Sequence, residues 1–200
     1  MPPREIPGLV NANGDFSDDP VSTGFRYFVN RALQPQLRAE IAAQFEKFRA
    51  TGLALDHVNG HLNLHLHPTI FRLLLESQAT LPPVRVTRDP FWLNARLARG
   101  LWFYRASHAF IFWILSARAR PRLRARGLRH TRLVFGLLQN ARVDEDYILK
   151  FLPHLPPGDT ELYSHPSLDE FRNEFDALIS PAVKQAVRER GIELIRYQDL

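Results

Sequence analysis

A strict alternation of polar residues and leucines sets the strongest limit on how this chain can fold. The alternating residues are, in order, His61, Leu62, Asn63, Leu64, His65, Leu66 and His67. Successive side chains of a β-strand point to opposite faces, so the pattern predicts a strand with one leucine face and one imidazole face. Such a strand needs a sheet partner and a covering layer that buries the leucines.

Helical patterns lie on both sides of this segment. From Gln36 to Ala50 the apolar residues follow an amphipathic stripe that ends at Gly52, and Pro68 opens a second helix over 69–78. Further strands are expected at 84–87, 133–137, 160–164 and 192–195. One or two helices are expected over 91–117, and further helices at 144–152 with Asp144 as its cap, 168–178 and 181–190. Strands that alternate with helices favour an α/β fold with a parallel sheet, either open or barrel-like.

The domain organisation follows from where these patterns begin. Residues 1–35 contain five prolines and show neither helical nor strand periodicity, which predicts an extended lead-in with Asp18 and Asp19 in a loop. Residues 36–200 predict a single α/β domain, long enough to bury one core.

Composition excludes several classes of site. The chain has no cysteine, so disulfides and thiolate metal sites are excluded, and any metal has to be held by His, Asp or Glu. The N-terminal sequence lacks the pattern of a secretory signal, and the longest apolar window, 109–115, is far shorter than the roughly 20 residues that cross a bilayer. We expect a cytoplasmic location, with peripheral contact at the inner membrane as an option.

The whole chain has a net charge of +5, and its basic residues concentrate in one segment. Seven arginines lie between Arg118 and Arg132, directly after the aromatic stretch 101–115. This pattern favours contact with an anionic lipid surface, while a solvated basic helix or loop explains it as well. The spacing resembles no base-reading motif, so nucleic acid is not an expected partner, and a homo-oligomer stays open.

Four of the eight histidines lie within eleven residues, at positions 57, 61, 65 and 67. On a strand, His61, His65 and His67 would emerge on one side, where neutral imidazole nitrogens bind divalent cations. A polar strand face whose histidines contact only water accounts for the same spacing.

A second candidate is His165, in the sequence Glu161-Leu-Tyr-Ser-His165-Pro166. It follows an apolar strand, and the active sites of parallel α/β folds gather at the carboxyl ends of strands. A turn with an exposed imidazole is the simpler interpretation of a His-Pro pair.

The two histidine segments together resemble the YdjC-like carbohydrate deacetylases, in particular the hopanoid-biosynthesis-associated (HpnK) type. The resemblance rests on the stretch from Leu55 to Pro68, on the late His165-Pro166 motif and on the closing segment 180–200. It extends over roughly the whole chain, including Leu155-Pro-Pro-Gly158.

The resemblance implies a metal-dependent hydrolase with a barrel-like α/β fold that removes an acetyl group from an N-acetylated sugar or glycolipid, including a hopanoid-linked sugar. It implies His61 as a ligand of a divalent metal, Mg or Zn, with His65 as a weaker candidate, and His165 as the acid that protonates the departing amine. No other cofactor is implied.

The sequence departs from the family pattern at its start. No Asp-Asp-Phe-Gly motif follows an apolar strand, and Asn63 stands where many relatives have a histidine. We therefore expect a partial barrel that lacks its first strand-helix units, with metal binding weak or absent in this chain. Two hypotheses remain: deacetylase activity of a longer full-length form, or a truncated, non-catalytic relative that docks on anionic membrane surfaces.

Overall fold

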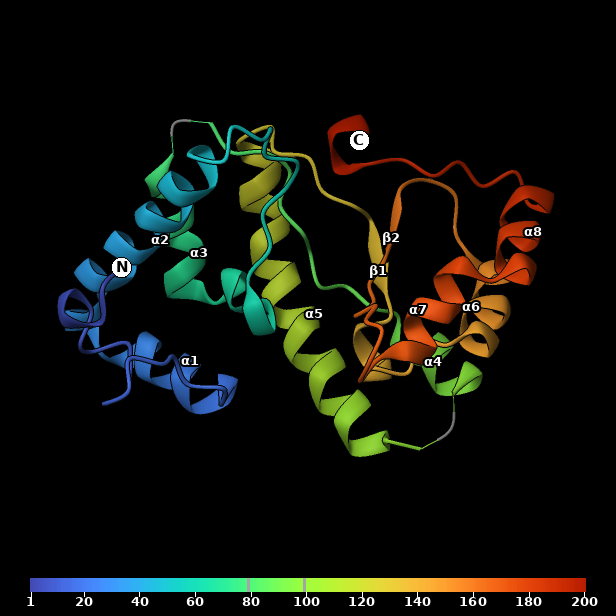
Figure 1. The fold of residues 1–200 in the computed structure, drawn as a ribbon, viewed down its shortest axis with the longest axis horizontal. Helices are drawn as coiled ribbons and strands as arrows, with labels where there is room; N and C mark the ends of the chain where they lie inside the picture. Colours follow the sequence, from blue (N-terminus) through green and yellow to red (C-terminus); the bar gives the residue numbers. More distant parts are fainter. Residues whose placement is uncertain (79, 99) are drawn as a thin grey trace. The chain divides into compact units, whose positions relative to one another are not determined.

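A computed structural model describes residues 1–78, 80–98 and 100–200, which form many short helices and a small sheet (Figure 1). The α-helices are α1 (Pro20–Val29), α2 (Gln34–Arg49), α3 (Pro68–Ser77), α4 (Phe91–Leu97), α5 (Trp102–Ala125), α6 (Glu145–Phe151), α7 (Arg172–Ile179) and α8 (Pro181–Glu189). The strands are β1 (Leu133–Phe135) and β2 (Thr160–Leu162). Short 3-10 helices are η1 (Pro3–Glu5), η2 (Arg31–Leu33), η3 (His61–Leu66), η4 (Leu137–Gln139), η5 (Leu152–His154) and η6 (Tyr197–Asp199).

The chain divides into two compact units. Unit 1 comprises residues 1–85 and 121–129, and unit 2 comprises residues 86–120 and 130–200. Each unit has a core of its own, so the division does not fall at the predicted boundary after residue 35.

Unit 1 begins with a folded segment, and the prediction of an extended lead-in is wrong. The Asp19 carboxylate caps α1 by accepting hydrogen bonds from the backbone N–H groups of Val21 and Ser22, at 3.0 and 3.2 Å. Pro20 occupies the first helical position, which requires no N–H donor. The segment also contributes to the core of unit 1, whose buried residues are Ile6, Leu9, Tyr27, Leu33, Leu37 and Leu73.

The predicted strand over residues 61–67 is also wrong, because the backbone hydrogen bonds of this segment are made within local turns. The backbone N–H of Asn63 donates to the carbonyl of Gly60, and that of His67 donates to Leu64, both at 2.9 Å. Leu62 and Asn63 adopt left-handed φ angles of 52° and 57°. The leucines therefore share no face, since Leu62 is exposed and Leu66 is buried.

Unit 2 contains the parallel pairing that the sequence predicted. Strands β1 and β2 pair in parallel with Val134 opposite Glu161, and α6 lies between them in the chain. Helices α6, α7 and α8 build the adjoining core, whose buried residues are Phe135, Val143, Tyr147, Ile148, Phe151, Leu152, Ala177, Val183 and Ala186. The α/β class is thus confirmed in a form rich in helices.

A barrel is not confirmed. Over residues 1–78, 80–98 and 100–200, strand pairing is confined to β1 with β2 and to two isolated bridges, one of which joins Val58 and Val84 in parallel. The predicted closing strand at 192–195 is wrong, because this segment makes no ladder before η6. The predicted helices are confirmed, and α4 and α5 divide the aromatic stretch between them.

A search of the same residues finds no helix that combines the length and the apolar character required to cross a membrane.

Gly136 fixes the chain path directly after β1. Its φ angle is 104°, and a Cβ at this position would overlap the backbone carbonyl oxygen of Tyr163, which follows β2. Only glycine combines this backbone conformation with such a close approach. The two strand ends therefore depend on the absence of a side chain here.

We expect Gly136→Ala to destabilise the protein by about 3 kcal/mol or more, through the left-handed conformation and the overlap with Tyr163. Gly158→Ala is the matched control, because Gly158 has a φ of 96° but no atom within 4 Å of an added Cβ. The control is expected to cost only about 1 kcal/mol. Urea unfolding followed by circular dichroism measures both, and equal losses would contradict the role of the overlap.

Candidate functional site

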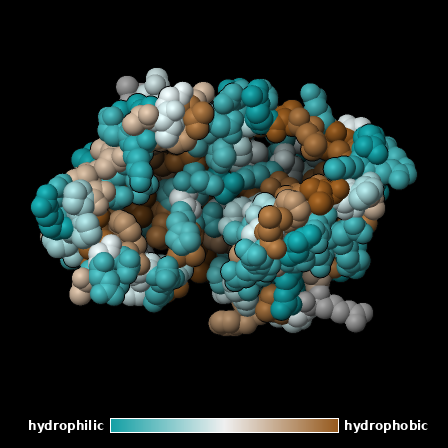
Figure 2. Space-filling model, in the orientation of Figure 1, coloured by the Kyte–Doolittle hydropathy of each residue, from teal (hydrophilic) through white to brown (hydrophobic). Residues whose placement is uncertain are grey.

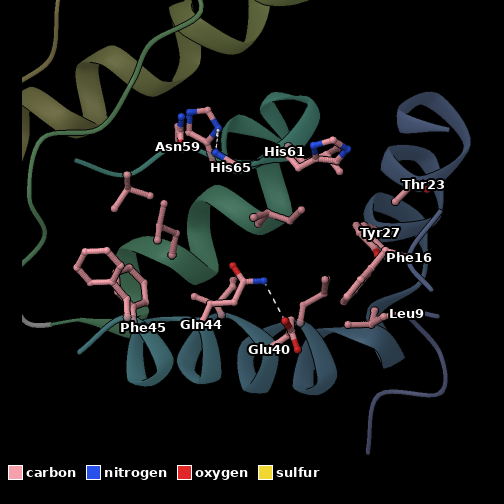
Figure 3. A pocket seen from close by; sticks show the side chains of 18 of the residues that line it. Leu9, Phe16, Thr23, Tyr27, Glu40, Gln44, Phe45, Asn59, His61 and His65 are labelled. Atoms are coloured by element: carbon pink, nitrogen blue, oxygen red, sulfur yellow. Dashed lines mark hydrogen bonds between the residues drawn. The ribbon is translucent and has the colours of Figure 1, made fainter. Parts of the chain in front are cut away.

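A cavity of about 670 Å³ opens within unit 1, between the helices and the histidine segment (Figure 3). Helix α2 forms one wall, with Glu40, Gln44 and Phe45 directed inward, and His61 lies across from it. The lining is mainly apolar, with aromatic rings from Phe16, Tyr27, Phe45 and Phe48. A concave apolar pocket with a few polar groups is the usual form of a small-molecule site.

The polar groups of the cavity wall are already ordered. Gln44 Nε2 donates to Glu40 Oε1 at 2.9 Å, and Glu40 Oε2 pairs with the N-terminal ammonium of Met1 at 2.7 Å. The Glu40 side chain is largely shielded from solvent. Rigid polar groups beside aromatic faces suit a ligand that combines hydroxyl or amide groups with apolar C–H faces, as a sugar ring does.

The three alternating histidines have three different environments. His61 is exposed beside the cavity, His65 is buried, and His67 packs edge-on against Phe28 with its ring centroid 6.4 Å away. Burial lowers the pKa of His67. Because the segment is a pair of turns, the imidazoles do not form the single polar face that a strand would give.

His65 is fixed by the backbone on both sides of its ring. Its Nδ1 accepts a hydrogen bond from the N–H of Gly60 at 3.0 Å, and its Nε2 lies 3.0 Å from the carbonyl oxygen of Arg85. The residue is only 4% exposed, and burial lowers the pKa of its ring to about 4. A metal ion could bind His65 only by displacing one of these hydrogen bonds.

The described residues do not complete a metal site. Over residues 1–78, 80–98 and 100–200, no group of three or more His, Asp or Glu side chains is placed to hold an ion. His61 fits the role of a single ligand, because none of the described residues forms a hydrogen bond with its ring. His57 is engaged by the carboxylate of Asp56, 2.8 Å from its Nδ1.

The strand end in unit 2 places His165 next to a tyrosine. The backbone N–H of Tyr163 donates to the carbonyl of Phe135 at 2.8 Å, which extends the pairing beyond β2. Tyr163 and His165 point to the same side, and the tyrosine hydroxyl lies 2.7 Å from His165 Nε2. The His165 side chain is 45% exposed, so it is accessible at the carboxyl ends of the parallel strands, as predicted.

A buried carboxylate holds this strand end in place. Glu174 on α7 is 0% exposed, accepts a hydrogen bond from the N–H of Val143 at 2.9 Å, and accepts another from the N–H of His165. Its Oε2 lies 3.7 Å from His165 Nδ1. Glu174 thus joins the segment after β1 to the segment after β2, and one of its carboxyl oxygens faces the imidazole.

A buried polar network supports the loop after β1. The Asp89 carboxylate accepts hydrogen bonds from the N–H of Leu138, at 3.0 Å, and from the amide of Asn94. Arg105 binds the carbonyl of Leu138 at 3.2 Å, and Tyr147 donates to Asn94 Oδ1 at 2.8 Å. Burial raises the pKa of Asp89 to about 7.

Sequence analysis missed Tyr163, Glu174 and this network. Tyr163 could have been found, because it lies two residues before His165 and strand periodicity puts both on one side. Glu174 could also have been found, since it occupies a buried position of α7 three residues before the buried Ala177. The network joins residues far apart in the chain, and no local pattern indicates it.

The structure places His61 in unit 1 and His165 in unit 2, so their action on a common substrate stays a prediction.

Comparisons with known proteins give a consistent result. A family model described as "YdjC-like protein" matches residues 1–189. The "Carbohydrate deacetylase" of Geobacillus stearothermophilus is 25% identical over 199 residues, which cover 99% of this chain and 71% of that protein. The "Carbohydrate deacetylase" of Brevibacillus brevis is 29% identical over 73 residues, which cover 36% of this chain and 27% of that protein. No solved structure matches the chain.

We expect the C2 proton of His65 to titrate with a midpoint of about 4 in an NMR experiment on the folded protein, because the charged ring would be buried. The unfolded ring has an ordinary pKa of 6.5, so the stability that neutral His65 contributes is complete above that value and is lost as the pH falls toward 4. The difference corresponds to roughly 3 kcal/mol of unfolding free energy. A midpoint at 6.5 would show a solvated ring and contradict the structural role of His65.

Proposed function

We propose that this chain, which belongs to the YdjC-like protein family, is a carbohydrate deacetylase that hydrolyses the acetamide bond of an N-acetylated sugar. The observation that carries the proposal is the alignment of 99% of the chain with a carbohydrate deacetylase. The accessible histidine at the paired strand ends of unit 2 supports the proposal, because it can serve this reaction as a proton donor.

The proposed role of His165 is that of general acid. Hydrolysis adds water to the acetyl carbonyl carbon and breaks the C–N bond, and the departing amine nitrogen needs a proton. His165 is accessible, and Nε2 is the ring nitrogen proposed to deliver this proton, because Nδ1 faces the buried Glu174. Glu174 is a positioning residue, because its carboxylate fixes the His165 backbone and faces Nδ1. Tyr163 holds the position of Nε2 through its hydroxyl.

A divalent metal, Mg or Zn, stays a proposal, and the proton transfer from His165 does not depend on it. His61 is the proposed ligand, because it is exposed and its ring makes no hydrogen bond within the described residues. His65 is the weaker candidate, because both of its ring nitrogens are already engaged by the backbone. A single free imidazole at the cavity binds a divalent ion only weakly.

The proposal includes two candidate types of sugar substrate. A hopanoid-linked N-acetylated sugar and a soluble N-acetylated oligosaccharide contain the same acetamide group, so the chemistry at His165 is the same for both. The assay therefore compares an N-acetylglucosaminyl glycolipid with a soluble chito-oligosaccharide.

We expect the protein, assayed in its natural full length, to release acetate from such a substrate. His165→Gln should lower kcat by roughly 10²- to 10⁴-fold, because the amine leaves without a proton donor. His154→Gln is the matched control, since His154 is another exposed histidine of unit 2. Glu174→Gln should change the pH profile of kcat, whereas a purely structural loss would lower activity equally at every pH.

Two results would contradict the proposal. The first is that neither substrate releases acetate, even with added Mg²⁺ or Zn²⁺. The second is that the kcat of His165→Gln equals that of the unmodified protein.

For metal binding, we expect isothermal titration with ZnCl₂ to show weak binding that His61→Ala abolishes and His154→Ala leaves unchanged, because His61 offers a free imidazole at the cavity. Tight binding that persists in His61→Ala would locate the metal elsewhere.

A further inference from the structure

Phe171 places an aromatic ring directly beside the proposed acid. Its ring centroid lies 5.5 Å from that of His165, at an interplanar angle of 41°. The Tyr163 ring contacts the same imidazole edge-on, with its centroid 4.7 Å away. All three residues belong to unit 2, where the His165 side chain is 45% exposed and Phe171 is half-buried. A molecule that reaches this imidazole from solvent therefore meets aromatic rings next to it.

The start of α7 holds Phe171 in this position. Its backbone N–H donates to Ser167 Oγ at 2.9 Å, and its carbonyl oxygen accepts from the N–H groups of Glu174 and Phe175, at 3.0 and 3.2 Å. Glu174 follows three residues later on the same side of the helix, and its carboxyl group accepts from the N–H of His165. One helix start therefore fixes both the ring and the hydrogen bond that positions the imidazole.

Phe171 lies outside the core that α6, α7 and α8 build. Among the described residues, the side chains that pack on this core do not include Phe171, although Ala177 of the same helix belongs to it. The residue three positions earlier, Leu168, is 64% exposed. In the part of Figure 2 that contains α7 and α8, hydrophobic side chains are exposed among hydrophilic ones. A half-exposed aromatic ring beside a proton donor is in a position to contact a ligand.

The chemistry of the proposed substrate fits a flat apolar surface. A pyranose ring in its chair form has hydroxyl groups around its edge and axial C–H bonds on its faces. Such a C–H face is apolar, and it packs on the face of an aromatic ring, whose potential is negative. An equatorial acetamide group projects from the edge of the same sugar ring. A sugar that stacks on Phe171 can therefore present its acetamide nitrogen to a neighbouring imidazole.

We propose that Phe171 is a specificity-determining residue whose ring stacks on the pyranose ring of the substrate and holds it at His165. The inference rests on the proposed function, because that function assigns His165 to the reaction. It favours a pyranose with equatorial substituents, such as an N-acetylglucosaminyl unit, since the faces of that ring carry only C–H bonds. An open-chain polyol with similar hydroxyl groups lacks such a face.

Binding is tested on the full protein with two neutral probes that contain no acetamide, methyl β-glucopyranoside and the open-chain polyol glucitol. NMR follows the C2 proton of His165 during each titration. We expect the glucoside to shift this resonance and glucitol to leave it unchanged. Phe171→Leu keeps an apolar side chain but removes the flat ring, so it should weaken glucoside binding about tenfold, whereas Phe171→Tyr should stay within about twofold.

Phe175→Leu is the matched control. Phe175 is another half-buried phenylalanine of α7, and the guanidinium of Arg172 lies over its ring, 6.0 Å from the centroid. The control should bind the glucoside like the unmodified protein, and circular dichroism verifies that each variant is folded. In the acetate assay, Phe171→Leu should raise KM about tenfold with little change in kcat, because stacking is the same in the ground state and the transition state.

Equal affinity of the glucoside for Phe171→Leu and for the unmodified protein would overturn the inference, as would glucitol that binds as tightly as the glucoside. The binding result does not depend on hydrolysis. Glucoside binding through Phe171 in a protein that releases no acetate would support the stacking and contradict the deacetylase activity. Acetate release with an unchanged KM in Phe171→Leu would contradict the stacking alone.

Discussion

Buried side chains in unit 2 supply the hydrogen bonds that the short sheet cannot. Strands β1 and β2 have three residues each, so the backbone groups beyond their carboxyl ends have few ladder partners. Glu174 accepts from the segments that follow both strands, and Asp89 accepts from the loop after β1. A buried carboxylate has a high desolvation cost and persists only with such donors. The position of His165 therefore follows from the hydrogen bonds that a buried carboxyl group requires.

The sequence predicted what depends on local pattern. The parallel strands and the helices of unit 2 were correct because their apolar periodicity and the cap residue Asp144 are local signals. The prediction for the first 35 residues failed for two reasons. Prolines occur both in short helices and in extended segments, so they do not distinguish the two. The burial of Ile6 and Leu9 depends on residues far away in the sequence, which no local pattern indicates. His165 was recognised as a candidate, but its buried partner Glu174 was not, since a helical glutamate is usually exposed.

The histidine segment shows why alternation can mislead. Period two indicates a strand only when a neighbouring strand takes up the backbone hydrogen bonds, and here the turns around Gly60 and Leu64 take them up instead. His61 and His65, four residues apart, therefore have different environments. His65 becomes a structural residue that joins Gly60 to Arg85, and this fixed turn leaves His61 free beside the cavity.

Two buried titratable groups, His65 and Asp89, act in opposite directions on stability. His65 stays neutral in unit 1, so raising the pH from about 4 to 6.5 favours the folded state. Asp89 keeps its proton in unit 2 up to about pH 7, while the unfolded carboxyl has an ordinary pKa of 3.8, so raising the pH through that interval favours unfolding. Between about pH 4 and 6.5 the two groups therefore have opposite effects on the free energy of unfolding. A buried imidazole in unit 1 and a buried carboxyl group in unit 2 thus give the two units pH dependences of opposite sign.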